Sequence, residues 1–427
     1  MKNRVRVAIV GVSADRGWGS VAHIPALRAL SDDIEIVGVA NTNRASAEAA
    51  AKAFALGRAY DSVDSLLVSP DVDVVAVTVK VPYHLDLVTK TLEAGKNVYC
   101  EWPLGNGLAE AEKLAALARR KQALAVVGTQ AVVSPEVQFV RDLVADGFVG
   151  EVRSTTYVGS GYTWGDEVTA GDAYAMDSKN GATLLSIVAG HAFSAMQSVL
   201  GPVSRVSGLV SQRRSTVRIV ETGEAIPMKT PDQVIVAAEF NSGVPLAFHL
   251  RGGIPCGTGL MWEISGSERD LRISARVKQI HPNINITPLL VEAGKRGEQG
   301  FSEVEVPSSY YFGLDDAPVA RNVAGIYRLM AQDIRQGTRS APGFDDAVGL
   351  HRILDAVELS SKTGERQQIG CKGRHHDREV KPWNKTSRPD RSRSKFPVRI
   401  IRSRLNAIPL GSWCQSRGVS SPTHEKL

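Results

Sequence analysis

The sequence has few cysteines and no long apolar run, and these two absences exclude several classes of protein. Only four cysteines occur among 427 residues, and none forms a Cys-x-x-Cys pair or a Cys/His cluster with zinc spacing. This argues against a disulfide framework or a metal site and suits a reducing cytoplasm. No apolar stretch is long enough to cross a membrane. The short N-terminal run breaks at Gly11, which is typical of a strand rather than a secretory signal.

The net charge of +6 hides an uneven distribution along the chain. From Cys371 onward the sequence carries 14 basic and 4 acidic side chains, so the preceding residues have a small negative balance. The positive surplus belongs to a tail at 369–427 that is rich in Arg, Ser and Pro, which predicts a disordered extension. A basic arm for an acidic partner is the alternative. The overall charge is therefore no argument for a nucleic-acid-binding fold.

Strand and helix signals alternate over the first 130 residues. Apolar, β-branched runs such as VRVAIV, IEIVGVA and VVAVTV are separated by helix-forming stretches such as ASAEAAAKAFA. This alternation predicts a parallel sheet with helices on both faces, the doubly wound α/β architecture. After about residue 150, strand-like segments with turns between them predict a mainly antiparallel, open-faced sheet with further helices. We therefore expect an NAD(P)-binding Rossmann domain at 1–130, an α+β substrate and oligomerisation domain at 131–368, and the tail.

The loop GVSADRGWGSVAH follows the first predicted strand, where a dinucleotide-binding protein has the pattern G-x-G-x-x-G. Gly11 fits the first glycine, Ser13 stands in place of the second, and Gly17 and Gly19 come late. From these residues alone, a surface turn with a buried tryptophan explains the loop as well as a cofactor site does.

Five strings along the chain carry a resemblance to a known family. They are GVSADRGWGSVAHIPAL, VKVPYHLDLVTKTLEAGKNVYCEWPL, GTQAVVSPEVQFVRDLVADGFVGEV, GHAFSAMQSVLG and LHRILDAVELSSKTG. In order and spacing they resemble the Gfo/Idh/MocA family, the glucose–fructose oxidoreductase and inositol dehydrogenase group, over roughly residues 4–368. Within it, the chain is most similar to the branch of the fungal galactose-pathway regulators. The resemblance implies an NAD(P)-dependent oxidoreductase acting on a sugar, polyol or related alcohol. A catalytically inactive NAD(P)-binding sensor is the alternative.

The resemblance implies that the long glycine loop is a complete cofactor loop. Its glycines would let backbone N–H groups approach a pyrophosphate at a helix N-terminus, and Trp18 would pack over the adenine or ribose or cover the loop. No acidic residue follows the second strand to bind the ribose of NAD, so NAD and NADP both stay open. His84 fits packing near the loop better than chemistry. The expected cofactor-binding residues are Gly11, Ser13, Gly17, Trp18, Gly19, Asn41, Arg44, Thr78, Lys80, Pro82, His84, Glu101, Trp102 and Gln130.

Most of the polar catalytic residues of the family are missing. The family motif Glu-Lys-Pro reads Glu-Trp-Pro here, and Trp102 can neither accept a proton nor carry charge. The second motif keeps His191 but has Ile187 in place of its acidic partner. His191 is the candidate for proton transfer, with a core histidine as the alternative. Lys80, at the end of a predicted strand, is the second catalytic candidate, and its alternative is a solvent-facing loop lysine.

A polar and aromatic segment, GYTWGDEVTAGDAYAMDSKNG, precedes His191. Aromatic faces and hydrogen-bonding groups suit a sugar or polyol, although the segment also fits an ordinary surface loop. The resemblance further implies a homo-oligomer, a dimer or tetramer built through the open sheet. The expected substrate-binding residues are Tyr162, Trp164, Tyr174, Asp177, Asn180 and His191.

Overall fold

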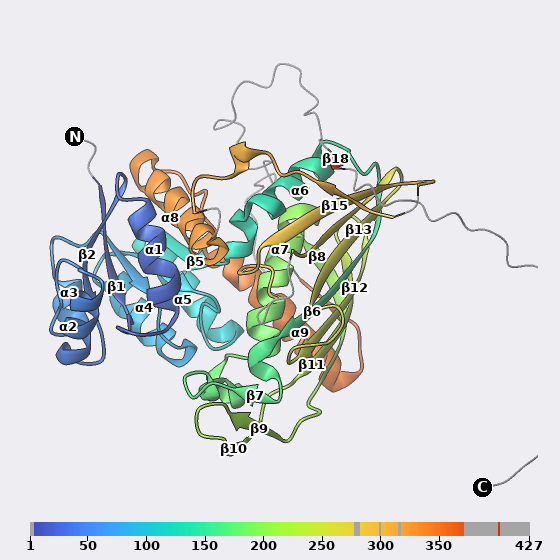
Figure 1. Cartoon of the computed structure of the whole chain (residues 1–427). Helices are drawn as coiled ribbons and strands as arrows, with labels where there is room; N and C mark the ends of the chain where they lie inside the picture. The colour runs from blue at the N-terminus through green and yellow to red at the C-terminus, as the bar shows by residue number, and fades with distance from the viewer. Residues whose placement is uncertain (1–3, 277–281, 299, 315–316, 371–399, 402–427) are drawn as a thin grey trace, which may run out of the picture.

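The computed structural model describes residues 4–276, 282–298, 300–314, 317–370 and 400–401. Apart from residues 369–370 and 400–401, the predicted tail lies outside the described residues. Two large sheets dominate the structure, one formed by the N-terminal part of the chain and one by the following part (Figure 1). Within the described ranges, no helix has both the length and the apolarity needed to cross a membrane.

The first sheet has five strands, all parallel, in the order β2-β1-β3-β4-β5. All four residues of β3 are buried, as expected for a strand covered by helices on both faces. The predicted doubly wound parallel sheet is therefore confirmed. Its strands are β1 (Val5–Val10), β2 (Ile34–Ala40), β3 (Val74–Val77), β4 (Asn97–Glu101) and β5 (Ala125–Gly128), and its helices are α1 (Ile24–Ala29), α2 (Arg44–Ala53), α3 (Val63–Leu67), α4 (His84–Glu93) and α5 (Leu108–Lys121).

A helix from far along the chain, α8 (Pro318–Gln336), completes one face of this sheet. It lies beside α1 in Figure 1, and its residues Val323 and Tyr327 share a buried cluster with Ile9 and Tyr99 of the sheet. The polypeptide thus returns to its N-terminal part after building the second sheet. The division of the chain at residue 130 stays a prediction.

The second sheet is mixed but mostly antiparallel, in the order β17-β8-β11-β12-β6-β13-β14-β15-β16-β18 over the described residues. The pair β12–β6 is parallel, and the neighbouring pairs that flank it are antiparallel. This confirms the predicted open-faced sheet with a mainly antiparallel pattern. Its strands are β6 (Val152–Gly161), β8 (Val203–Ser211), β11 (Gln233–Phe240), β12 (Pro245–Gly252), β13 (Leu260–Gly266), β14 (Arg269–Ala275), β15 (Leu289–Lys295), β16 (Ser302–Val304), β17 (Gln367–Gln368) and β18 (Ile400–Ile401).

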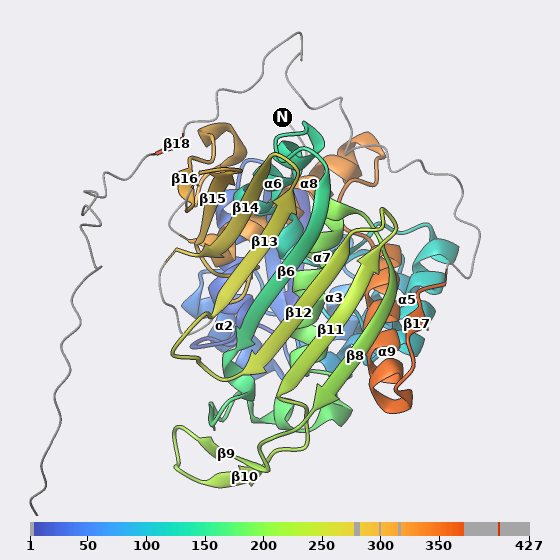
Figure 2. The ribbon, with the colours of Figure 1, turned by 90° about the vertical axis from the view of Figure 1, so that its right-hand side faces the viewer.

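Helices cover one face of the second sheet and leave the other open (Figure 2). Behind the strands lie α6 (Pro135–Ala145), α7 (Gly190–Leu200) and α9 (Phe344–Thr363). On the open face, Ile235 of β11 pairs opposite Leu209 of β8, and both side chains are exposed. A small third sheet, β10-β9-β7, lies at one end of the molecule and consists of β7 (Glu167–Val168), β9 (Thr216–Ile219) and β10 (Ala225–Pro227).

Candidate cofactor and active site

The loop after β1 is a tight turn that only glycine fits at two points. Gly11 has φ +102°, and a Cβ there would come within 2.7 Å of the Val79 side chain. At Gly19 a Cβ would lie 2.9 Å from the Thr78 hydroxyl. The chain then enters the helical turn η1 (Gly19–His23), which continues into α1. Backbone N–H groups at such a strand-to-helix turn form the anion site that a pyrophosphate requires.

Two residues expected to bind the cofactor hold the loop itself. The backbone N–H of Val12 donates to the Asn41 side-chain oxygen at 3.0 Å, and the Asn41 amide donates to the Val12 carbonyl at 2.7 Å. The Thr78 hydroxyl donates to the carbonyls of Val10 and Gly11, at 3.0 and 3.2 Å. Both side chains therefore form hydrogen bonds with the main chain of the loop, and these bonds fix the shape of the loop.

Ser13 and Arg44, two further residues expected to bind the cofactor, also make their polar contacts within the protein. The Ser13 hydroxyl donates to Asp15 at 2.6 Å. Arg44, at the exposed start of α2, forms ion pairs with Glu48 at 2.7 Å and with Asp61. A 2′-phosphate would have to displace carboxylates from Arg44. Trp18 packs half-buried against the cluster that contains α8, and its indole N–H is buried without a partner among the described residues.

A buried polar network lies at the carboxyl ends of β4 and β5. The His23 Nε2 lies 2.9 Å from Glu101 Oε1, and His23 Nδ1 lies 2.8 Å from the Tyr327 hydroxyl. The Gln130 amide donates to both Glu101 oxygens, at 3.1 and 2.8 Å. Burial by itself would raise the pKa of the Glu101 carboxyl, but the hydrogen bonds from His23 and Gln130 hold it below its usual range. Glu101 is thus a carboxylate at neutral pH. The side-chain oxygen of Gln130 is buried and has no partner within the part of the chain that the structure describes.

Trp102, which replaces the family lysine, packs between two helices. Its indole N–H donates to the Ser186 carbonyl at 2.8 Å, and its ring centre lies 4.7 Å from that of His351 on α9. A Cβ at Gly190, the first residue of α7, would collide with the indole. The only donor of Trp102 is therefore used in packing, and the side chain offers no polar atom for proton transfer.

His191 lies in α7, one residue beyond the contact with Trp102. Its side chain is 5% exposed, and its Nδ1 has no hydrogen-bond partner among the described residues. Burial lowers the pKa of His191 to about 4, against the opposing effect of the Glu101 charge. The imidazole is neutral at pH 7 and has a ring nitrogen available to a ligand. A pKa of about 4 also makes it a weak base.

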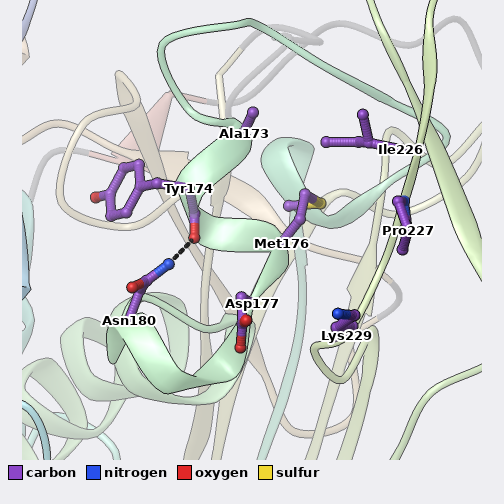
Figure 3. Close-up of a pocket in the computed structure, with 8 residues that line it drawn as sticks. All are labelled: Ala173, Tyr174, Met176, Asp177, Asn180, Ile226, Pro227 and Lys229. Atoms are coloured by element: carbon purple, nitrogen blue, oxygen red, sulfur yellow. Dashed lines mark hydrogen bonds between the residues drawn. The ribbon is translucent and has the colours of Figure 1, made fainter.

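A pocket of about 230 Å³ brings together three of the six residues expected to bind substrate (Figure 3). Asn180 donates to the Tyr174 carbonyl at 2.7 Å, and Asp177 lies on the same turn. The Lys80 ammonium lies 4.4 Å from the centre of the Tyr174 ring, which links the end of β3 to this wall. The pocket is lined by Ala173, Tyr174, Met176, Asp177, Asn180, Ile226, Pro227 and Lys229.

Tyr162, Trp164 and His191 are not among the residues that line this pocket. Trp164 is 4% exposed and its ring lies against Gly161, so it belongs to the core of the second sheet. His84 is buried between two carbonyls, with Nδ1 2.8 Å from Pro103 O and Nε2 2.9 Å from Val79 O. This placement agrees with a packing role, and Pro82 lies in the adjoining turn η2 (Val81–Tyr83).

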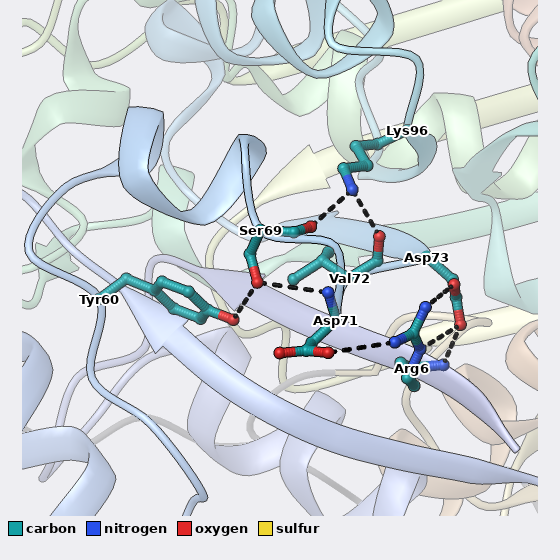
Figure 4. A network of polar contacts seen from close by, with 7 residues as sticks. All are labelled: Arg6, Tyr60, Ser69, Asp71, Val72, Asp73 and Lys96. Atoms are coloured by element: carbon teal, nitrogen blue, oxygen red, sulfur yellow. Dashed lines mark hydrogen bonds and ion pairs between the residues drawn. The ribbon is translucent and has the colours of Figure 1, made fainter.

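The opposite, amino-terminal edge of the first sheet is closed by ion pairs (Figure 4). The Arg6 guanidinium binds Asp73 at 2.7 and 3.1 Å and reaches Asp71 at 3.4 Å. The Lys96 ammonium donates to the carbonyls of Ser69 and Val72, at 2.7 and 2.8 Å. These contacts join the loops before β3 and β4 to β1. Ligands of doubly wound sheets bind at the carboxyl edge, so this network is structural.

The carboxyl edge fits a dinucleotide on two observations. The glycine turn leaves no room for a Cβ at Gly11 or Gly19. Three buried polar atoms lack a partner within the described part of the chain, namely Trp18 Nε1, Gln130 Oε1 and His191 Nδ1. Buried polar atoms are normally paired, so these atoms suit an extended polar ligand. The described residues contain no group of His, Cys, Asp and Glu side chains that could hold a metal ion.

Sequence reasoning missed His23, Tyr327 and His351. His23 is part of the first resemblance string, and its position directly after the glycine loop is the one signal that could have drawn attention to it. Tyr327 and His351 lie far along the chain, and their contacts depend on the return of α8 and α9 to the first sheet.

Comparison with known proteins agrees with this geometry. Residues 5–129 match the Gfo/Idh/MocA oxidoreductase family, described as an NAD-binding Rossmann fold, and residues 135–275 match the C-terminal domain of Gal80p. The chain is 28% identical over 379 residues to Dehydrogenase aclE of Aspergillus oryzae, covering 86% of this chain and 98% of that protein.

Two solved structures show the same fold. The transcriptional regulator Gal80p of Kluyveromyces lactis superposes with a TM-score of 0.74 at 26% identity, covering 86% of this chain and 94% of that one. Levoglucosan dehydrogenase, in a complex with NADH and levoglucosan, superposes with a TM-score of 0.74 at 17% identity, covering 86% and 100%. The N-terminal part of the chain, residues 5–129, therefore matches the Gfo/Idh/MocA oxidoreductase family with its NAD-binding Rossmann fold, and a region of the Gal80p C-terminal type follows it.

Proposed function

We propose that the protein is an NAD(P)-dependent oxidoreductase that acts on a CH–OH group of a sugar, polyol or related alcohol. The observation that carries the proposal is His191, a buried neutral imidazole whose Nδ1 has no partner in the described residues. It lies near the carboxylate of Glu101, at the edge where the glycine loop would hold a dinucleotide. Similarity to Dehydrogenase aclE and the fold of levoglucosan dehydrogenase support this class of substrate.

The protein residues would divide the reaction between them. A bound nicotinamide would supply the hydride acceptor. Gly11 and Gly19 would admit the pyrophosphate, and Gln130 would offer its free side-chain oxygen to a donor on the cofactor. His191 would accept the hydroxyl proton as the alcohol is oxidised. Lys80, on the wall shared with Tyr174, would orient the substrate through hydrogen bonds.

We propose NAD rather than NADP as the physiological cofactor. The support is Arg44, whose guanidinium is already paired with Glu48 and Asp61. These carboxylates would repel a 2′-phosphate, whereas a ribose 2′-hydroxyl requires no displaced ion pair.

A second function is a catalytically inactive sensor that binds NAD(P) and acts through a protein partner. The observation that favours it is Trp102, which puts a packed indole where a proton-handling lysine would stand and has already used its N–H. Similarity to Gal80p of Kluyveromyces lactis, which is described as a transcriptional regulator, points the same way.

One experiment separates the two functions. The full chain is titrated with NAD and NADP, and a panel of sugars and polyols is then screened for reduction of the bound cofactor. The enzyme requires turnover on at least one substrate, and His191→Asn should then lose most of it with cofactor affinity unchanged. Tight cofactor binding without turnover on a broad panel would reject the enzyme in favour of the sensor.

We also propose a cytoplasmic homo-oligomer. Cys100 is a free, buried thiol in the first sheet, as in a reducing compartment. The exposed pair Leu209 and Ile235 marks the open face through which copies would associate. Sedimentation of the wild type and of Leu209→Lys tests this interface, because a monomeric wild type would rule it out.

A further inference from the structure

Glu101 is a buried carboxylate whose partner in the described residues is a histidine rather than a lysine or arginine. Its side chain contacts His23 and Gln130, and no lysine or arginine of the described ranges forms an ion pair with it. His191, the other histidine that feels its charge, is neutral at pH 7 because its pKa is about 4.

His23 links the Glu101 carboxylate to a phenol. Its Nε2 lies 2.9 Å from Glu101 Oε1, and its Nδ1 lies 2.8 Å from the Tyr327 hydroxyl. The amide of Gln130 donates to the same carboxylate. Within the described residues, Glu101 is thus held by an imidazole and an amide rather than by a lysine or an arginine.

The position of Glu101 in the first sheet indicates which half of a dinucleotide would lie near its carboxylate. It is the last residue of β4, and Gln130 follows β5. In a doubly wound sheet the pyrophosphate binds at the turn after β1 and the adenosine lies toward the second strand. Since the order here is β2-β1-β3-β4-β5, the other half must extend across β3 toward β4. Glu101 and Gln130 are thus on the nicotinamide side.

We propose that Glu101 makes the site select the oxidised cofactor, so that the protein binds NAD⁺ more tightly than NADH. This inference rests on the proposed cofactor site. The nicotinamide ring carries a positive charge only in the oxidised form, and a carboxylate in a water-poor environment attracts that charge strongly. Lys80, the cation beside this edge, is exposed and lies over the Tyr174 ring, where water screens it.

The test compares two affinities in three proteins. Dissociation constants for NAD⁺ and NADH are measured by calorimetry with the full-length wild type, Glu101→Gln and Asp15→Asn, and ADP-ribose serves as a ligand without a nicotinamide. We expect the wild type to favour NAD⁺ and Glu101→Gln to lose a factor on the order of ten in the NAD⁺/NADH preference. Asp15, an exposed carboxylate in the glycine loop, should affect both affinities equally when removed, because the pyrophosphate is common to both.

The outcomes separate this inference from the proposed cofactor site. If ADP-ribose and both dinucleotides fail to bind the wild type, the cofactor site itself is refuted. If they bind and the wild type favours NADH, or if Glu101→Gln binds ADP-ribose normally with an unchanged NAD⁺/NADH ratio, only the role of Glu101 is refuted. The wild-type ratio keeps the test decisive even if Glu101→Gln does not fold.

Discussion

Replacing His351 with phenylalanine should make the protein less sensitive to acid. His351 lies on α9 against Trp102 and is 3% exposed, and its buried Nε2 has no partner in the described ranges. Burial lowers the pKa of its imidazole from 6.5 to about 4. Between these two pH values the unfolded chain binds a proton at this residue and the folded chain does not. The stability that His351 contributes is therefore complete above about pH 6.5 and is lost as the pH falls toward 4.

The size of the effect follows from the two pKa values. A pKa of about 4 in the folded state against 6.5 in the unfolded state lowers the free energy of unfolding by about 2 kcal/mol at pH 5 and about 3 kcal/mol at pH 4, relative to pH 7. Phenylalanine keeps a flat ring against Trp102 but has no titratable nitrogen. It also removes an unpaired buried polar atom, so the variant should be at least as stable as the wild type at pH 7.

Urea unfolding of the full-length protein at pH 7 and pH 5 measures the difference. The loss of stability between the two values should be about 2 kcal/mol smaller in His351→Phe than in the wild type. His249→Phe is the control, because His249 is only half-buried on β12, and its removal should change the pH dependence much less. An identical pH dependence in the wild type and His351→Phe would refute the reasoning, since it would mean that the folded protein protonates His351 as readily as the unfolded chain does.

Three further changes test the packing around the site. Gly19→Ala places a Cβ 2.9 Å from the Thr78 hydroxyl and should weaken NAD binding at least tenfold in calorimetry, whereas Gly57→Ala, with no atom closer than 3.5 Å, should leave binding unchanged. Arg321→Met strands the buried carboxylate of Glu136 and should lower the urea-derived stability by about 3 kcal/mol or more, with partial recovery when Glu136→Leu is added. Asp73→Asn, at a partly exposed ion pair, should cost about 1 kcal/mol in the same assay.

The features that the sequence predicted correctly are those with a local cause. Alternating apolar runs and helix formers were enough for the parallel sheet, because each strand and helix carries its own periodicity. The glycine loop could also be placed, since the close approach of Gly11 and Gly19 to the segment after β3 requires glycine at these positions. The inability of Trp102 to transfer a proton could also be predicted, because replacing a lysine with tryptophan removes a charge in any conformation.

The features that remained out of reach depend on contacts between distant parts of the chain. Tyr327 is 304 positions from His23, and nothing in either local sequence shows that α8 returns to β4. Trp164 was expected to bind substrate, but it is buried in the core. Its aromatic, polar surroundings suggested a sugar-binding wall, but Gly161 leaves a slot beside the second sheet that the indole fills, and Gly252 leaves room for the Trp164 carbonyl. Such slots become visible only when the strands are paired.

The buried network connects the two proposed functions more closely than the motif changes suggest. An indole at position 102 removes a positive charge from the edge that also holds Glu101, and His191 cannot restore it because its pKa is about 4. Close to position 102, the edge therefore holds a buried carboxylate and a weak base. For an enzyme, such a charge favours the form of the cofactor that accepts hydride but does little for the proton. For a sensor, the same charge is sufficient, because a difference in affinity between two redox states of a ligand is all that a population shift requires.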